Sequence, residues 1–278
     1  MSALLAARPL PTPRLPGFGA SLAVTLTVVL ALVVIPLLAL VVVVSRAEPA
    51  HVVEVLSSQR TLAAYGLSFG AAAAAALLSV PLGLGIAWTL VRHDVPARRF
   101  WNALVDLPFA MPTAVSGIAL TQLWGPSGAF GGLLAPLGLE VAFTRVGVVL
   151  ALVFVSLPFV VRTVQPVLES FPRETEEAAA SLGADRITTF RRVILPALRP
   201  ALVAGATLGF ARAIGEYGSV VFIAGNVPFR TEIAPLLVLV RLEEYDYAGA
   251  AAIATGMLFA SAAILAILAR RGVGARHG

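Results

Sequence analysis

The sequence predicts an all-α membrane protein with six transmembrane helices, and three observations support this fold class. Of the 278 residues, 59% are hydrophobic and 13% are charged, whereas soluble proteins average about 45–50% apolar and about 25% charged residues. The apolar residues gather in runs of about 20, which is the length that crosses the hydrocarbon core as a helix. No stretch shows the alternation of apolar and polar residues that is typical of a membrane β-barrel.

We expect the six spans near residues 20–44, 61–91, 100–124, 145–161, 200–223 and 248–268. The first is too long for the apolar core of a signal peptide, which has about 7–15 residues, so we expect it to be retained. The fourth is the shortest, and Arg162 is expected to reach toward the interface at its end. Pro108 and Pro112 should bend the third span because they remove backbone donors, and the bend is a candidate gate.

The arginines are divided unevenly between the two sides of this predicted membrane domain. The tails and every second connection hold fourteen of the twenty basic residues, the opposite side holds five, and Arg212 lies within a span. Basic residues mark the cytoplasmic side, so both termini are predicted to be cytoplasmic. The chain then divides into a tail (1–19), a six-helix domain (20–270) containing a cytoplasmic connection at 169–199, and a second tail (271–278).

Two absences narrow the possible functions. The chain has no Cys, which excludes disulfides and thiolate metal sites. All twenty basic residues are Arg, so the chain lacks the Lys of a Walker A phosphate loop and of a Schiff base. The three His lie outside the spans without an HExxH pattern, so we predict no catalytic residue and no metal site, and an intramembrane enzyme is only a remote alternative. No basic aromatic module accompanies the Arg residues, so nucleic-acid binding is not predicted.

The cytoplasmic connection at 169–199 predicts two short helices separated by a break. Pro172 is suited to a first helical turn, and the acidic residues that follow it suit a helix N-terminus. Gly183 can adopt the left-handed conformation that ends a helix, and Asp185 can cap the next one. Pro196 is expected to end the segment. The second helix would carry an apolar stripe of Ile187, Phe190 and Ile194.

The same connection contains a spaced motif. Three residues separate Glu177-Ala178-Ala179 from Gly183, and nine more separate Gly183 from Val193-Ile194-Leu195-Pro196. This pattern resembles the EAA motif of bacterial ABC importer permeases, with Val193 at the usual Ile position. The resemblance implies docking on a separate ATPase subunit; a solvated helix-turn-helix is the alternative. The implied coupling residues are Glu177, Ala178, Ala179, Gly183, Val193, Leu195 and Pro196.

A second resemblance concerns the substrate. The segments DLPFAMP (106–112), GEYGS (215–219), FIAGN (222–226), TEIAPLL (231–237) and YDYAGA (245–250) resemble sulfate/thiosulfate permeases of the CysT (CysU) type. Over about residues 20–270, this implies a type I importer fold in the bacterial inner membrane. It also implies a second permease of the CysW type, a CysA-type ATPase dimer that uses ATP and Mg, and a periplasmic sulfate-binding protein. No cofactor is implied for this chain, and molybdate, tungstate or another oxyanion remains an alternative substrate.

Charged side chains within the predicted spans are candidate functional residues because charge is costly in a bilayer. These are Asp106, Arg212 and Glu216. Arg212 and Glu216 are four residues apart, hence on one helical face and able to pair. Such a pair can simply stabilise helix packing, or Arg212 can offer a positive contact to a transported anion.

Small residues and a polar connection complete the predictions. Gly215, Gly218 and Ser219 give the fifth span a surface that allows close helix packing, against a second permease or around the pathway, or else a ligand site. The connection at 225–247 faces the side where a binding protein would dock, although simple solvation explains its charges as well. The chain has no internal repeat of the kind common in ion-driven secondary transporters.

Overall fold

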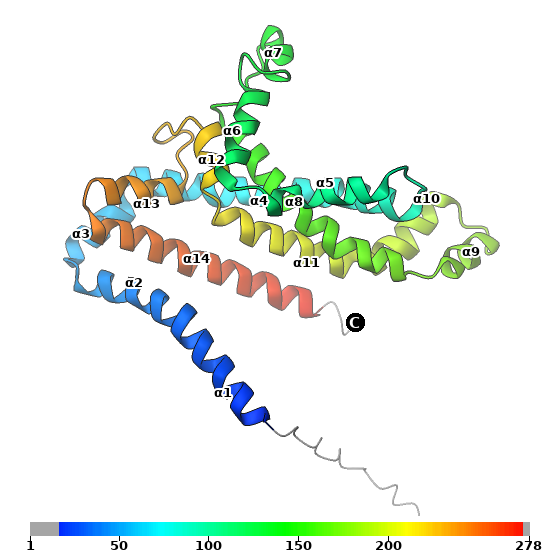
Figure 1. Cartoon of the computed structure of the whole chain (residues 1–278), viewed down its shortest axis with the longest axis horizontal. Helices are drawn as coiled ribbons and strands as arrows, with labels where there is room; N and C mark the ends of the chain where they lie inside the picture. Colours follow the sequence, from blue (N-terminus) through cyan, green and yellow to red (C-terminus); the bar gives the residue numbers. More distant parts are fainter. Residues whose placement is uncertain (1–16, 275–278) are drawn as a thin grey trace, which may run out of the picture.

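Four long helices run side by side through the structure, a computed structural model that describes residues 17–274 (Figure 1). They are α4 (Gln59–Arg92), α8 (Arg145–Ser170), α11 (Leu195–Ile214) and α14 (Tyr247–Gly274). Helices α4, α8 and α11 pack against one another, and α14 packs against α11. Within the described residues every regular element is a helix, which agrees with the predicted all-α class.

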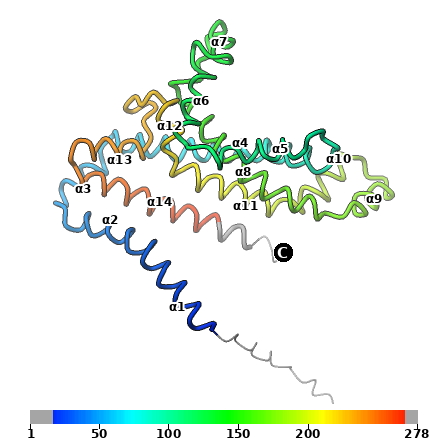
Figure 2. Tube along the Cα trace, viewed as in Figure 1, coloured from blue at the N-terminus to red at the C-terminus, as the bar shows by residue number. Residues whose placement is uncertain are grey.

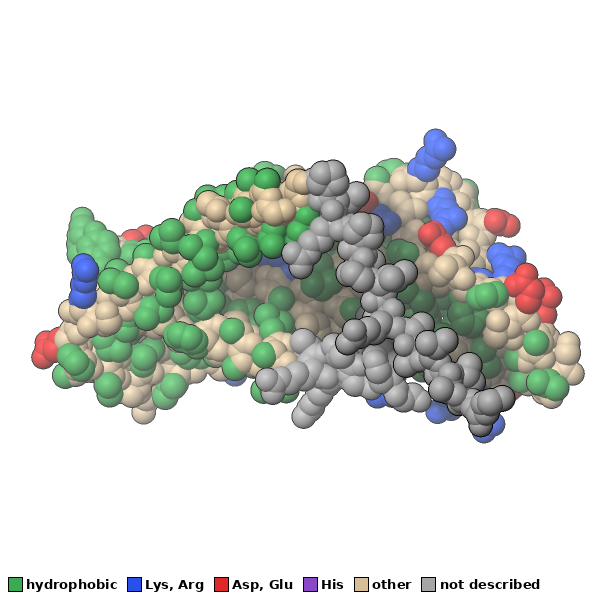
Figure 3. All heavy atoms as spheres, turned by 90° about the horizontal axis from the view of Figure 1, so that it is seen from below, with side chains coloured by type: hydrophobic (Ala, Val, Ile, Leu, Met, Phe, Trp, Pro, Cys, Tyr) green, Lys and Arg blue, Asp and Glu red, His purple; other side chains and the backbone are tan. Residues whose placement is uncertain are grey.

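Five helical segments are long and apolar enough to cross a membrane: Phe18–Arg46, Gln59–Arg92, Arg145–Ser170, Arg186–Ile214 and Tyr247–Leu268. Helices α5 (Arg98–Ala110) and α6 (Thr113–Trp124) meet the same criterion only as a pair, which would make a sixth span. Side chains of both signs gather at the end that carries α9 and α10, beside a long hydrophobic stretch (Figure 3). This distribution fits helices that span a bilayer.

The third predicted span is broken rather than merely bent. A bend of 113° separates α5 from α6, and Met111 and Pro112 between them have extended backbone conformations. The ring of Pro112 disfavours the helical region for the residue before it, so the helix ends at Ala110. Pro108 lies inside α5 and leaves that helix continuous. Helix α6 and the short α7 (Gly131–Leu134) consequently project sideways from the long helices (Figure 1).

The first span is one rod made of α1 (Phe18–Val29), a π-helical turn at Leu30–Val34 and α2 (Ile35–Arg46). A second π-helical turn, at Phe190–Ile194, joins α10 (Arg186–Thr189) to α11. Each π turn lies just before a proline, Pro36 or Pro196, which cannot donate to the carbonyl four residues earlier. The altered register lets the helix pass the proline. Helix α2 packs on α14, whereas α1 leans away (Figure 2).

Two predicted spans have different bounds in the structure. The fourth continues to Ser170, so Arg162 lies inside α8 instead of reaching out at its end. The fifth was expected at 200–223 but begins at Arg186 and ends at Ile214. Pro196 therefore lies within a continuous helix and does not end the preceding segment. Helix α12 (Gly218–Ile223) is a separate element after a break at Gly215.

The core of the bundle depends on close backbone approach between α4, α8 and α11. A Cβ on Gly83 would lie 2.7 Å from Val160 Cγ1, and one on Gly205 would lie 2.8 Å from Val160 Cα. The hydroxyls of Ser79 and Ser156 are joined by a buried hydrogen bond of 2.8 Å. Small residues bring the three helices into contact, and here they lie at positions that the sequence did not single out.

Two amphipathic helices lie at the end of the molecule opposite α9 (Figure 1). They are α3 (Pro49–Ser57) and α13 (Ala234–Glu243), and with α4 and α14 they enclose a small apolar core that includes Val55, Leu237 and Ile253. A polar connection was expected at 225–247, and α13 occupies much of it. The predicted tail at 1–19 lies almost wholly outside the described residues. Of the tail at 271–278, the part up to Gly274 continues α14 and the rest lies outside them.

Candidate functional site

The segment with the spaced motif forms the helix-break-helix that its sequence predicts. Helix α9 (Arg173–Ser181) follows Pro172, with Glu174 and Glu176 in its first turn. Gly183 has φ of 83°, the left-handed conformation expected after a helix end. Asp185 then caps α10, because its carboxylate accepts a 2.7 Å hydrogen bond from Thr188 N–H. Hydrogen bonds from Thr188 lower the pKa of the Asp185 carboxyl, so the cap stays ionised at neutral pH.

The motif residues differ in exposure. Glu177 and Ala178 are exposed, Ala179 is partly buried, and Leu182 at the tip is 89% exposed. Val193 and Leu195 are partly buried and Pro196 is exposed on the following helix. The predicted stripe is only partly correct, because Ile194 is buried while Ile187 is 67% exposed. The segment therefore exposes an apolar tip and a nearby carboxylate.

A small polar and aromatic cluster connects this segment to the spans. Arg92, in the last turn of α4, pairs with Glu176 of α9 at 2.6 Å. The guanidinium of Arg92 lies 5.8 Å from the ring centroid of Trp88, within the range of a cation–π contact. The ring of Trp88 meets that of Phe190 edge to face at 5.5 Å. These contacts connect α9 to α4, and α4 to the π turn that leads into α11.

The first intramembrane charge, Asp106, is paired with Arg162. The guanidinium of Arg162 donates to both carboxylate oxygens of Asp106, at 2.7 and 2.6 Å. It also donates to the side chain and the carbonyl of Asn102 and to the side chain of Gln165. A planar guanidinium is suited to such a fork. The network joins α5 to α8, which explains why α8 accommodates Arg162 within the helix.

The second pair, Arg212 and Glu216, forms as predicted, at 2.6 Å between Nη1 and Oε2. Glu216 is 2% exposed and follows the end of α11. Its other oxygen accepts hydrogen bonds of 2.9 Å from both the backbone N–H and the hydroxyl of Ser219. Arg212 is more open, with its side chain 36% exposed. Ser219 therefore anchors the carboxylate, and the guanidinium faces accessible space.

The predicted small-residue surface packs inside this chain. A Cβ on Gly218 would come too close to the hydroxyl of Thr113, and one on Gly117 would lie 2.6 Å from the carbonyl oxygen of Ser219. Gly218 and Ser219 therefore let α12 pack on α6. Gly215 has open space around its Cα and lies in the break before α12. None of the three lies on the fifth span, because α11 ends at Ile214.

The sequence matches the protein family described as "Binding-protein-dependent transport system inner membrane component" over residues 79–273. The chain belongs to this family. Two similar relatives are a "Probable sulfate transport system permease protein cysT" of Nephroselmis olivacea and a "Sulfate transport system permease protein CysT" of Salmonella typhimurium. The first is 48% identical over 243 residues, covering 87% of this chain and 86% of the relative. The second is 46% identical over 251 residues, covering 90% and 91%.

Solved structures support the type I ABC importer fold of this permease. A chain from the crystal structure of a bacterial ABC transporter involved in the import of the acidic polysaccharide alginate aligns with a TM-score of 0.70 at 14% identity. The alignment covers 91% of this chain and 94% of that one. An amino acid ABC transporter aligns at 0.53 with 16% identity, covering 76% and 94%. These structures show the fold, and membership of the transport family makes the chain a permease subunit and not an enzyme.

Two ionic contacts at the α3–α13 end were missed by sequence reasoning. Arg60 donates two hydrogen bonds to Glu232, at 2.8 and 2.7 Å, and Glu232 is 3% exposed. Asp246 accepts from His51 at 2.9 Å and from Gly249 N–H at 2.8 Å, and lies 3.3 Å from Arg241. Each partner is distant in sequence, 172 residues for Arg60 and 195 for His51. The two acids lie in the TEIAPLL and YDYAGA segments, and this resemblance was the only feature of the sequence that pointed to them.

Proposed function

We propose that this permease moves sulfate, and thiosulfate with it, across the bacterial inner membrane as part of an ATP-driven importer. The observation that carries the proposal is the similarity to permeases named for sulfate transport, at 46–48% identity over 87–90% of this chain. Sulfate is doubly charged, so its passage needs a path through a low-dielectric layer. A permease for molybdate, tungstate or another oxyanion is the competing assignment.

We propose that energy enters through the segment Glu177–Pro196. Its exposed tip would dock on a CysA-type ATPase dimer that binds ATP and Mg, and this chain itself would bind no cofactor. The Arg92–Glu176 pair and the contact of Trp88 with Phe190 would transmit the closure of the dimer to α4 and α11. A second permease of the CysW type would complete the pathway, and a periplasmic sulfate-binding protein would deliver the anion.

The proposed orientation puts α9 and both termini in the cytoplasm. The support is the uneven distribution of Arg, since cytoplasmic connections of membrane proteins carry an excess of basic residues. The connection that holds α9 has five of them, at 173, 186, 191, 192 and 199. In this orientation α3, α13 and the pair Arg60–Glu232 lie on the periplasmic side, where the binding protein would approach.

We propose Arg212 as a contact for the anion within the pathway. Its guanidinium is partly exposed, while Glu216 is held by Ser219 as well as by Arg212. The remaining N–H donors of Arg212 can then reach a passing oxyanion, for which guanidinium geometry is well suited.

The transported anion is tested by uptake of labelled sulfate into cells that lack the natural copy of this chain and express it from a plasmid. We expect an excess of unlabelled thiosulfate to reduce sulfate uptake strongly. The same excess of molybdate should reduce it only weakly. Stronger competition by molybdate than by thiosulfate would assign the permease to the alternative substrate class. A strain that receives the empty plasmid is the control.

The coupling role is tested at Gly183. Replacement by Val places a β-branched residue at φ of 83°, which is strained, whereas Asn tolerates this conformation. In the purified complete transporter, Gly183→Val should lower sulfate uptake per ATP hydrolysed at least several-fold, and Gly183→Asn should stay near the wild-type ratio. Deletion of Ala178–Leu182 should abolish coupling. An unchanged ratio in both the Val variant and the deletion would refute the assignment.

A further inference from the structure

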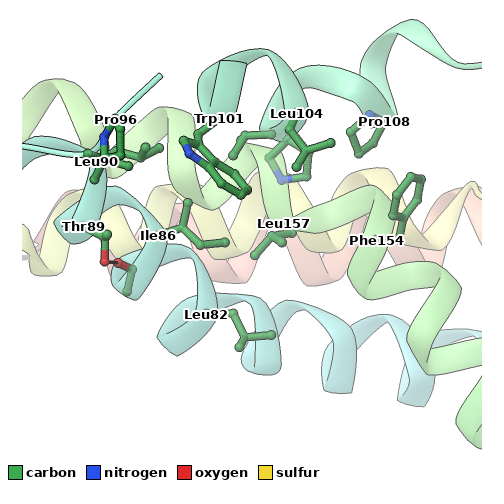
Figure 4. A pocket seen from close by; sticks show the side chains of 14 residues that line it. Leu82, Ile86, Thr89, Leu90, Pro96, Trp101, Leu104, Pro108, Phe154 and Leu157 are labelled. Atoms are coloured by element: carbon green, nitrogen blue, oxygen red, sulfur yellow. Dashed lines mark hydrogen bonds between the residues drawn. The ribbon is translucent and has the colours of Figure 1, made fainter. Parts of the chain in front are cut away.

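A large apolar cavity of about 750 Å³ lies between α4, α5 and α8. Leu82 and Ile86 of α4, Trp101 and Leu104 of α5, and Phe154 and Leu157 of α8 surround it (Figure 4). Its one hydroxyl, that of Thr89, already donates to the carbonyl of Gly85 at 2.8 Å. The lining carries no charged side chain, and its only other side-chain donor is the indole N–H of Trp101, so the cavity is suited mainly to hydrocarbon and not to a doubly charged oxyanion.

A second, polar cavity of about 240 Å³ adjoins the same helix ends. The large cavity reaches Leu90 and Trp101, whereas the small one is lined by Val91, Arg92 and Arg98, so the end of α4 and the start of α5 border both. Arg173 of α9 contributes a third guanidinium. In the proposed orientation this polar cavity lies at the cytoplasmic end of the hydrophobic one.

The charges around the small cavity favour an anion despite two acids nearby. Arg98 pairs with Glu169 at 2.8 Å, and Arg92 pairs with Glu176 at 2.6 Å. Arg173 has no ion pair among the described residues and supplies the excess positive charge. Arg98 keeps further N–H donors beyond the one that Glu169 accepts. A phosphodiester can therefore be bound without breaking either pair.

We propose that one anionic phospholipid of the cytoplasmic leaflet occupies these two cavities, with an acyl chain in the large one and its phosphate at Arg98 and Arg173. Basic pockets between transmembrane helices on the cytoplasmic side are suited to acidic headgroups, and Trp101 lies where indole rings favour the interface. The proposal rests on the orientation proposed above, and it is independent of which anion is transported. The bound lipid fills the space beside α5, the helix that leads into the 113° break.

The test counts lipids retained by the purified complete transporter in native mass spectrometry, after reconstitution with phosphatidylglycerol or phosphatidylcholine. A Cβ on Gly85 meets open space, so Gly85→Leu fills the large cavity without a clash. Gly70→Leu, on the same helix, is the matched control because its Cβ position is also open and it does not line the cavity. We expect wild type and Gly70→Leu to retain one phosphatidylglycerol more than Gly85→Leu, and no such difference with phosphatidylcholine.

The headgroup is tested with Arg98→Gln and Arg173→Gln. Each should weaken phosphatidylglycerol retention about five-fold, which corresponds to ~1 kcal/mol for a basic residue near an anionic surface. Equal retention by Gly85→Leu and wild type, or equal retention of the two lipids, would overturn the proposal. Because the chain has no Cys, Leu104→Cys can be cross-linked specifically, and efficient cross-linking to the second permease would show that a protein covers the cavity. Sulfate uptake is measured in the same preparations. If uptake is normal while any of these outcomes overturns the lipid site, the proposed transport function still stands.

Discussion

The two ion pairs within the transmembrane region are built in opposite ways. In the pair between α5 and α8, Arg162 uses its donors on Asp106, Asn102 and Gln165, while the acid is 47% exposed. In the pair after α11, the acid is the fixed partner, since Glu216 is 2% exposed and also accepts from Ser219. Arg212 makes a single ionic contact in the described part of the chain.

This difference distinguishes a pair that holds two helices together from one whose guanidinium has donors to spare. A guanidinium whose five N–H groups are engaged holds two helices together but has little left for a ligand. A guanidinium with free donors beside an anchored carboxylate can bind an anion and release it again. The comparison therefore supports the proposal that Arg212 contacts the substrate, whereas the contacts of Arg162 position α5 against α8.

The largest effect is expected from Arg212→Gln, which should reduce sulfate uptake at least a hundred-fold. The substitution removes the proposed anion contact and also leaves Glu216 buried without its partner, at a cost of about 3–5 kcal/mol. Uptake by whole cells and the amount of assembled complex in the membrane are both measured.

The double variant Arg212→Gln/Glu216→Gln separates the two consequences. It restores a neutral, hydrogen-bonding pair, so assembly should return to near the wild-type amount. Uptake should stay low if Arg212 contacts the anion. Recovery of uptake together with assembly would show that Arg212 only neutralises Glu216, and the distinction from Arg162 would disappear.

The next effect concerns the pair on the α3–α13 side, where Arg60 meets a buried acid. Arg60→Gln should destabilise the complex by about 3–5 kcal/mol because Glu232 is left buried and uncompensated. Thermal unfolding of the purified transporter measures this loss, and Arg60→Gln/Glu232→Gln should recover most of it. Uptake per assembled complex should stay near wild type. A strong loss of uptake in a fully assembled variant would instead indicate that Arg60, like Arg212, acts in transport and not only in stability.

A smaller effect is expected for Arg162→Gln. Asp106 is half exposed and can be solvated, so the loss is that of hydrogen bonds to charged groups, about 1–3 kcal/mol. Arg162→Lys keeps the charge but not the fork, and should destabilise the complex nearly as much. Thermal unfolding again provides the measurement. If Arg162→Lys unfolds at the same temperature as wild type, charge alone matters at this position.

The sequence predicted the elements that depend on local chemistry. The long apolar runs, the helix start after Pro172, the left-handed Gly183 and the Asp185 cap each follow from properties of the residue itself. The Arg212–Glu216 contact was also expected from the four-residue spacing, although Glu216 lies just past the end of α11 instead of on one helical face with Arg212. Coupling and pathway roles for these residues remain predictions.

The elements that the sequence missed depend on distant partners. Arg162 belongs inside α8 because Asp106, 56 residues away, neutralises it. Helix α13 forms where we expected a polar connection, since Leu237 packs with Val55 and Ile253 from other helices. The full break at Met111–Pro112 exceeded the expected bend, and the π turn before Pro196 let a helix continue where we expected it to end.

The smallest expected effect is a pH dependence at Asp246, outside the spans. Burial alone would raise the pKa of this carboxyl, but the hydrogen bonds from His51 and Gly249 and the charges of His51 and Arg241 outweigh burial and lower it. A carboxyl with a lowered pKa stabilises the folded state above its ordinary pKa, and this contribution is lost as the pH falls through the lowered value. Thermal unfolding of wild type and Asp246→Asn is the measurement. Wild type should lose the stability that ionised Asp246 contributes as the pH falls below about 4.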